Sequence, residues 1–169
     1  MAELSRADAE ATAYGVGLLL DDGDVVLEGG TLQTVEGLAN LAQVLQLRML
    51  TPWGTDPINA AYGLDLRDAL TIGLGRDAMK ALVRLNLIRT VAADPRVSEV
   101  RSVLFDDDPD YIAAHPDAAV APGDSERRRR ALVEITFDPV PLPQDGTAGM
   151  SAAALTGGTG VSLLTDLSW

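Results

Sequence analysis

The segment that most constrains the fold is a long amphipathic stretch that ends at a proline and leads directly into a strand-like stretch. Its apolar side chains recur at three- and four-residue steps, at Met79, Leu82, Val83, Leu87 and Val91. This period predicts a helix over residues 76–93. Pro95 has no backbone N–H and disfavours helix in the residue before it, so Asp94-Pro95 ends the helix. Residues 97–105 follow, and we interpret them as a strand with imperfect alternation.

Other periodic segments predict further helices and strands. An apolar stripe predicts a helix over residues 35–50, with Thr34 as its N-cap, and its members are Leu38, Leu41, Leu45 and Met49. Asp65 is expected to cap a short helix through residue 72. Residues 131–137 alternate cleanly between apolar and polar side chains and predict a strand. Two apolar runs flank an Asp-Gly turn within residues 16–28, which predicts a β-hairpin.

Composition divides the chain into three parts. Residues 1–13 are polar and alanine-rich, and we expect a loose, flexible N-terminal arm. Residues 14–138 form the main domain, whose fold class we expect to be α+β: a small, mostly antiparallel sheet with two main helices packed on it. Residues 139–169 form an extended C-terminal arm, a linker rich in Pro, Gly and Ala followed by an apolar tip. That tip either docks back on the domain or adds a strand to a partner.

The charge narrows the class of partner. The chain has 169 residues and a formal net charge of −12, which disfavours nucleic acid and anionic membranes because phosphate binding needs a dense basic surface. The same charge suits docking onto a basic protein face. The absence of cysteine excludes disulfides, thiolate nucleophiles and cysteine-ligated metals. With no signal-peptide pattern and no apolar run of about 18 residues, we expect synthesis and assembly in the cytoplasm.

Candidates for catalysis or ligand binding are sparse. His115 is the one histidine and lies beside Pro116 in an acidic segment, a poor place for a serine-type base. The acidic run at residues 106–110 lacks the distal Glu of a calcium loop, and we interpret it as a solvated loop. The glycines of residues 73–75 lack a Walker-type lysine and favour a turn before a helix. The four arginines of residues 127–130 form either an anion site or, as we favour, pairs with the nearby acidic loop.

We therefore predict no catalytic, cofactor-binding or metal-binding residue, and we expect a protein that is not an enzyme. Two carboxylates across a cleft, as glycoside hydrolysis requires, are left open by composition alone, since Asp and Glu total 25.

Three segments in this order resemble the baseplate wedge protein family of contractile tails. They are Leu47-Arg48-Met49-Leu50-Thr51-Pro52-Trp53-Gly54, the loop of residues 56–66, and the junction of residues 93–97. The family includes phage protein W, the type six secretion baseplate homologue and relatives in extracellular contractile injection systems; its common label "lysozyme-like" is no sign of catalysis. The resemblance covers about residues 15–137. Tyr62, Gly63, Pro95 and Arg96 match the family pattern. Asp94 stands where the family often has Glu, and Pro57 lies further upstream than the family's proline.

The resemblance implies a structural component of a phage-like tail or contractile injection system, present in six copies around the tube base, in a particle that stays in the cell or is released. Such a protein joins other wedge proteins, tube or hub proteins and the sheath protein, and it templates the first sheath ring by strand exchange. The implied partner-binding residues are Asp94, Pro95, Arg96, Trp53, Tyr62 and Gly63.

Other interpretations stay open. The junction taken alone indicates a helix stop with an internal ion pair, so Arg96 is either a docking contact or an internal residue. The alternative functions are a peptidoglycan hydrolase, which needs two carboxylates across a sugar-sized cleft, and a stand-alone adaptor that binds one partner through the C-terminal tip.

Overall fold

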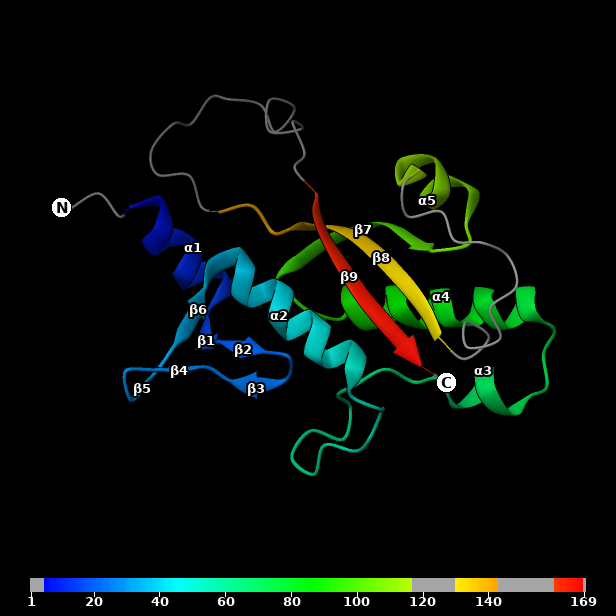
Figure 1. Ribbon diagram of the computed structural model, residues 1–169, viewed down its shortest axis with the longest axis horizontal. Coiled ribbons are helices and arrows are strands. Elements are labelled where there is room, and N and C mark those ends of the chain that lie inside the picture. Colours follow the sequence, from blue (N-terminus) through cyan, green and yellow to red (C-terminus); the bar gives the residue numbers. More distant parts are fainter. Residues whose placement is uncertain (1–4, 117–129, 143–159, 169) are drawn as a thin grey trace.

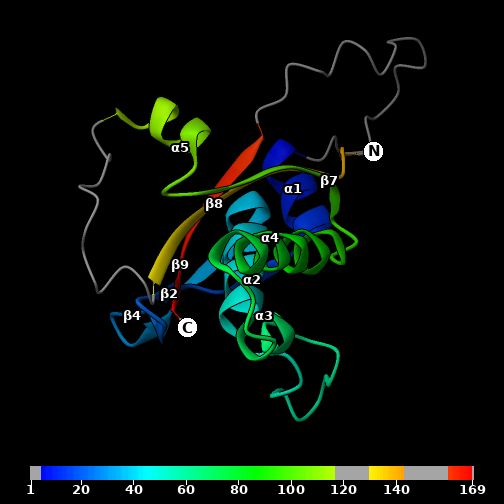
Figure 2. The same ribbon diagram turned by 90° about the vertical axis from the view of Figure 1, so that its right-hand side faces the viewer.

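The computed structural model describes residues 5–116, 130–142 and 160–168. Within them the chain has the expected α+β fold (Figure 1). A three-stranded antiparallel sheet is packed on one face by two helices, and a group of short strands lies at one end. The turned view in Figure 2 shows these helices on the same side of the sheet. No helix in the described ranges is both long and apolar enough to cross a membrane.

The helices are α1 (Arg6–Tyr14), α2 (Gly37–Leu50), α3 (Arg67–Thr71), α4 (Arg76–Ala92) and α5 (Pro109–Ala114). The long strands are β7 (Val97–Phe105), β8 (Arg130–Pro139) and β9 (Val161–Ser168), which pair in the order β7-β8-β9. The short strands are β1 (Val16–Leu18), β2 (Leu20–Asp21), β3 (Asp24–Val25), β4 (Leu27–Glu28), β5 (Thr31–Leu32) and β6 (Thr34–Glu36).

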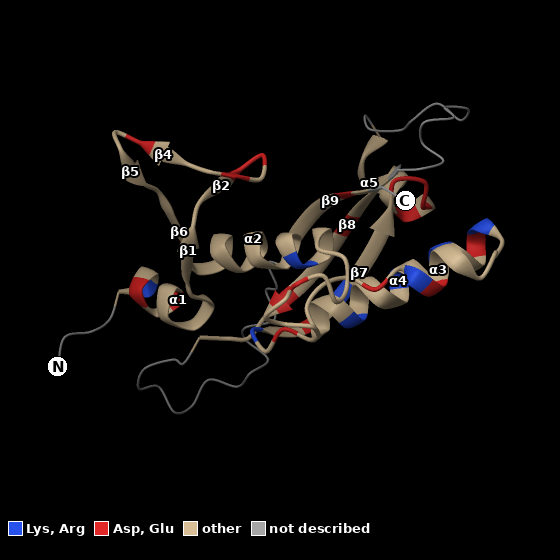
Figure 3. Ribbon diagram, turned by 90° about the horizontal axis from the view of Figure 1, so that it is seen from below, with Lys and Arg blue, Asp and Glu red and all other residues tan. Residues whose placement is uncertain are grey.

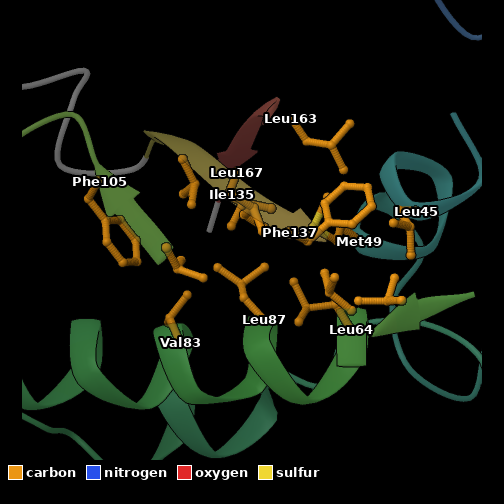
Figure 4. Close-up of a cluster of buried hydrophobic side chains, with 14 of the residues drawn as sticks. Leu45, Met49, Leu64, Val83, Leu87, Phe105, Ile135, Phe137, Leu163 and Leu167 are labelled. Carbon is orange, nitrogen blue, oxygen red and sulfur yellow. The ribbon is translucent and has the colours of Figure 1, made fainter. Parts of the chain in front are cut away.

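The core lies between the inner face of the sheet and helices α2 and α4 (Figure 4). The clean alternation of β8 sends Val133, Ile135 and Phe137 inward, where all three are fully buried. The buried apolar side chains of the two helices pack in the same core. They are Val83, Leu87 and Val91 of α4, and Leu41, Leu45 and Met49 of α2. Each such side chain contributes about 1.5–3 kcal/mol through burial, so the two predicted helices and the predicted strands are held by one shared core.

The C-terminal tip docks back on its own domain. β9 pairs antiparallel with β8 over its whole length, from Phe137↔Val161 to Arg130↔Ser168. Leu163 and Leu167 alternate inward and join the core. Of the two fates expected for the tip, docking in cis is the one observed; the linker residues 143–159 lie outside the described residues.

Several segments differ from the sequence-based expectation. The N-cap of α3 is Leu66 and not Asp65, and part of the expected acidic loop forms α5. Residues 6–13, expected in a loose arm, belong to α1, because Ser5 and Asp8 make a capping box at its start and Tyr14 is buried at its end. Thr34 is not the N-cap of α2: it lies in β6 and pairs with Leu18, and α2 begins at Gly37. Pairing with a strand earlier in the chain overrides the local capping signal there.

The predicted hairpin is part of a larger β structure. β2 and β3 pair around the Asp22-Gly23 turn as expected, but β4 pairs with β5 and β1 pairs with β6. We call residues 16–36 the three-ladder lobe. It extends from the start of α2, away from the three-stranded sheet (Figure 3).

Candidate functional site

The junction after α4 is a tight turn built by Asp94 and Pro95. The N–H of Val97 donates to the carbonyl oxygen of Asp94 at 3.0 Å, so residues 94–97 close a four-residue turn with proline at its second position. The carboxylate oxygen Oδ1 of Asp94 also accepts the backbone N–H of Arg96 at 3.0 Å. Asp-Pro-Arg thus encodes the turn locally, because aspartate bonds its own backbone two residues on and proline presets the dihedral angle.

Arg96 folds back onto Asp94 in a bidentate ion pair. Its Nε donates to Oδ1 at 2.9 Å and its Nη2 to Oδ2 at 2.8 Å. The Asp94 side chain is only 6% exposed, whereas that of Arg96 is 26% exposed. The hydrogen bond from Arg96 holds the pKa of the Asp94 carboxyl below its ordinary value, and Asp94 in turn raises the pKa of the Arg96 guanidinium.

The same guanidinium ties the junction to the start of the chain. Nη1 of Arg96 donates to the carbonyl oxygen of Tyr14, the last residue of α1, at 2.9 Å. The amide of Asn40 in α2 donates to that same oxygen at 3.0 Å. The Tyr14 hydroxyl donates to the Val140 carbonyl, and the Val140 N–H donates to the Arg96 carbonyl. Segments α1, α2, the α4–β7 turn and the exit from β8 therefore meet at one point.

The loop after α2 is closed by Gly63. Its φ of +111° is a left-handed value, and a Cβ there would lie 2.5 Å from the Thr51 carbonyl oxygen. This close approach lets Leu64 N–H donate to Thr51 at 2.8 Å and Trp53 N–H donate to Leu64 at 3.0 Å. Glycine after Tyr62 is thus a backbone requirement of the loop.

Tyr62 connects the loop to the end of α2. Burial raises the pKa of its phenol. The Arg48 guanidinium carbon lies 5.4 Å from the centre of the Tyr62 ring. Two of the three segments that resemble the baseplate family, the end of α2 and the loop of residues 56–66, are thereby in contact.

The six residues predicted to bind a partner have different surroundings. Asp94 and Arg96 form the ion pair of the junction, Tyr62 lies half-buried beside Arg48, and Gly63 is buried in the loop backbone. Pro95 is exposed beside them. Trp53 anchors the loop through its N–H, while its side chain is 40% exposed and makes no described polar contact with the junction.

Sequence reasoning missed Tyr14, Asn40 and Arg48 as members of this site. Asn40 was detectable as a polar residue beside the apolar stripe of α2, and Tyr14 as an aromatic residue at the end of an alanine-rich segment. Arg48 stood within the quoted motif, but its approach to Tyr62 depends on the path of the loop. The Nε of Arg48 is buried without a hydrogen-bond partner among the described residues.

The other sequence candidates have structural partners. Asp107 and Asp108, expected in a solvated loop, pair with cations of α4: Lys80 contacts both, and Arg84 Nη2 lies 2.7 Å from Asp108. Nε2 of His115 lies 3.4 Å from Glu134, whose other oxygen accepts from the Ser162 hydroxyl at 2.5 Å. The carboxylate stands between serine and histidine, which is not the order of a serine triad.

Residues 127–129 lie outside the described part of the chain, so their expected pairing with the acidic segment stays a prediction. Within the described ranges, no group of three acidic, histidine or cysteine side chains is arranged to hold a metal ion.

No protein-family model matches the chain, and no curated protein matches it significantly.

Proposed function

We propose that this protein is a structural baseplate component of a contractile injection system or phage-like tail. In this role it joins the wedge to the first sheath ring and templates sheath assembly by adding a strand across the edge of its sheet. The observation that carries the proposal is a difference between the two edges of the β7-β8-β9 sheet. Side chains bond backbone groups of the β7 edge, whereas no described side chain bonds the outward backbone groups of the β9 edge.

The β7 edge is blocked near its end. Asp106 N–H donates to Leu132, so the backbone groups of Leu132 and, by alternation, Glu134 point toward β7. The backbone groups of Val103 and Phe105 consequently point outward. Arg84 Nε donates to the Val103 carbonyl at 3.1 Å, and Asp108 accepts the Phe105 N–H at 2.7 Å. Side chains thus occupy the groups that a further strand would need.

The β9 edge has no such cap among the described residues. By the same alternation, the backbone groups of Val133 and Ile135 bond to β9. The backbone groups of their partners Thr165 and Leu163 therefore point toward β8. The backbone N–H and C=O groups of Ser162, Leu164 and Asp166 point away from the sheet. Unpaired groups in such a row are the template on which a partner strand adds, and they fix its register.

The connection into β9 suits a strand that takes part in assembly. Phe137 and Val161 face each other across the ladder, yet residues 140–160 separate the two strands. An ordinary hairpin closes with about two to five residues. The extra length lets β9 shift or exchange without straining β8.

The junction adds a second contact for the wedge. Arg96 pairs with the nearly buried carboxylate of Asp94 and stays partly exposed itself. Three of the five guanidinium N–H groups of Arg96 are bonded internally, which leaves two for a partner carboxylate. Arg96 is in this proposal both an internal anchor and a docking contact.

The test blocks the open edge without removing the strand. In cells that make the particle, Leu164→Pro removes one outward N–H, while Leu164→Ala changes the same side chain and keeps that N–H. We expect at least a tenfold loss of sheathed particles for the proline variant and near-normal numbers for the alanine variant, counted by negative-stain electron microscopy.

Thermal unfolding of both purified variants controls for damage to the sheet. Normal sheathed particles from a folded Leu164→Pro protein would overturn edge templating. Absence of the wild-type chain from purified sheathed particles would overturn the baseplate assignment itself.

A further inference from the structure

The three-ladder lobe has a fixed backbone. Three backbone hydrogen bonds form a closed ring. The N–H of Leu19 donates to the carbonyl of Gln33 at 2.9 Å, that of Gln33 to the carbonyl of Val26 at 3.0 Å, and that of Val26 to the carbonyl of Leu19 at 3.0 Å. This ring joins the stem β1–β6 to the arms β2–β3 and β4–β5. The side-chain amide of Gln43 in α2 then holds the stem, accepting from Leu20 N–H and donating to the Leu18 carbonyl.

The lobe has no hydrophobic core of its own. No residue from 16 to 36 is buried, and Leu27 is 63% exposed. Its exposed large apolar side chains are Val16, Leu18, Val25, Leu27 and Leu32. Leu27 faces Leu32 across one arm, and Val25 faces Leu20 across the other. Two-stranded ribbons are marginal in water without an apolar face to bury, so this arrangement leaves apolar pairs available for a partner.

The charge of the lobe has one sign. It carries Asp21, Asp22, Asp24, Glu28 and Glu36, and residues 7–47 contain no Lys, Arg or His. In Figure 3 the ribbon of the lobe has red segments and no blue ones. Asp21 and Asp24 face each other directly across the β2–β3 ladder, with Asp22 in the turn between them. Like charges opposite one another destabilise a ladder. A neighbouring cation would relieve that repulsion, and none of the described ion pairs involves these three residues.

We propose that the three-ladder lobe is a docking surface for a partner protein whose contact face has an apolar centre and a rim of Arg or Lys. Apolar pairs on the arms supply the buried centre of the interface, and the carboxylates supply the complementary rim. A second copy of this chain would bring the same acidic groups together and is disfavoured. Nucleic acid and anionic membranes carry the same sign of charge and are disfavoured as well. This contact is separate from the β9 edge and from the Arg96 junction.

The first test locates the occupant in the full chain. A photoreactive benzophenone amino acid is placed at Leu27, or at Leu85 on α4 as an exposed apolar control. After irradiation in the producing cells, cross-linked peptides are identified by mass spectrometry. We expect the Leu27 probe to join a peptide of another protein whose surface carries Arg or Lys, at a yield at least tenfold above that of Leu85.

The second test asks whether charge directs the contact. The triple variant Asp21→Asn, Asp22→Asn, Asp24→Asn keeps the turn shape and removes three charges. We expect it to reduce the same cross-link at least fivefold, and its thermal midpoint should equal or exceed that of the wild type because the cross-strand repulsion is gone.

Several results would overturn the proposal. These are cross-linking of Leu27 only to residues 117–130 of the same chain, cross-linking only to a second copy, and a yield no higher than that of Leu85. A cross-link to a partner face without basic residues, or one unchanged in a folded triple variant, would equally reject the assigned chemistry.

Discussion

At the scale of single residues, Arg96 acts first on its own chain. It supplies three side-chain hydrogen bonds, two to a nearly buried carboxylate and one to the end of α1. Loss of its charge would leave Asp94 buried without a counter-ion, which is more costly than losing an exposed pair. An assembly defect of an Arg96 variant must therefore be separated from a loss of stability.

Asp94→Asn tests the internal role through pH. We expect a loss of about 1.5–3 kcal/mol in the free energy of unfolding at pH 7, because a charge-assisted pair in a buried place is weakened. The pKa of Asp94 is lowered in the folded state, so its contribution is present above the unfolded value of about 3.9 and disappears as pH falls through the folded value. Urea unfolding should give a difference between wild type and variant that is constant from pH 7 to 5 and shrinks below about pH 4.

The chain contains a matched control for this prediction. Arg67 forms a bidentate ion pair with Asp65 at the same two-residue spacing. Its Nε donates to Oδ1 at 2.9 Å and its Nη2 to Oδ2 at 2.6 Å, but this pair is solvent-exposed. Asp65→Asn should reduce stability much less than Asp94→Asn, because water screens the exposed pair. Equal losses in the two variants would contradict the importance of burial at the junction.

At the scale of elements, the loop between α2 and α3 depends on its backbone crossing. Residue 63 passes so close to Thr51 and Pro52 that only glycine fits, and this crossing turns Tyr62 toward Arg48. At the other end of the loop Ile58 is 96% exposed, and the hydrogen bonds there join only residues 56–62 to one another. Order in this loop therefore comes from its closing end.

Gly63→Ala should open that crossing. We expect a loss of about 3 kcal/mol or more in the free energy of unfolding, from an unfavourable positive φ together with a clash against backbone carbonyls. Gly73→Ala is the control, since Gly73 also has a positive φ, +69°, but open space around it, and it should lose only about 1 kcal/mol. Chemical denaturation measures both, and similar losses would show that φ alone sets the requirement at residue 63.

The elements differ in how far the sequence could predict them. α4, β7 and β8 were predicted because their apolar period coincides with the face that is buried. The lobe ladders were missed in part, since pairing of Thr34 with Leu18 depends on contacts across the whole segment. At the candidate site, the sequence could predict the turn at Asp94-Pro95 and the possibility of an internal pair. It could not predict the bond from Arg96 to Tyr14, because nothing local specifies which distant carbonyl will lie there.

At the scale of the whole molecule, the sheet is completed by its last strand. β9 covers the β8 edge and adds Leu163 and Leu167 to the core, so a chain without it would expose apolar residues of β8 and α2. The same strand presents the open edge in the proposed assembly. Domain stability and assembly competence are therefore joined in one segment that arrives through a long connection.

Strand complementation tests this dependence. A chain of residues 1–142 should unfold at a lower temperature than the full protein, and a separate peptide of residues 160–169 should bind it and raise its thermal midpoint by at least about 5 °C, because a ligand of the folded state stabilises it by mass action. A peptide with Leu163→Ser and Leu167→Ser should fail, because both side chains are buried. A peptide with Leu164→Ser should succeed, since Leu164 is 53% exposed. If the two altered peptides were equally effective, the docking of β9 would not depend on its inner face, and the covalent connection rather than apolar complementarity would be what holds the strand to the sheet.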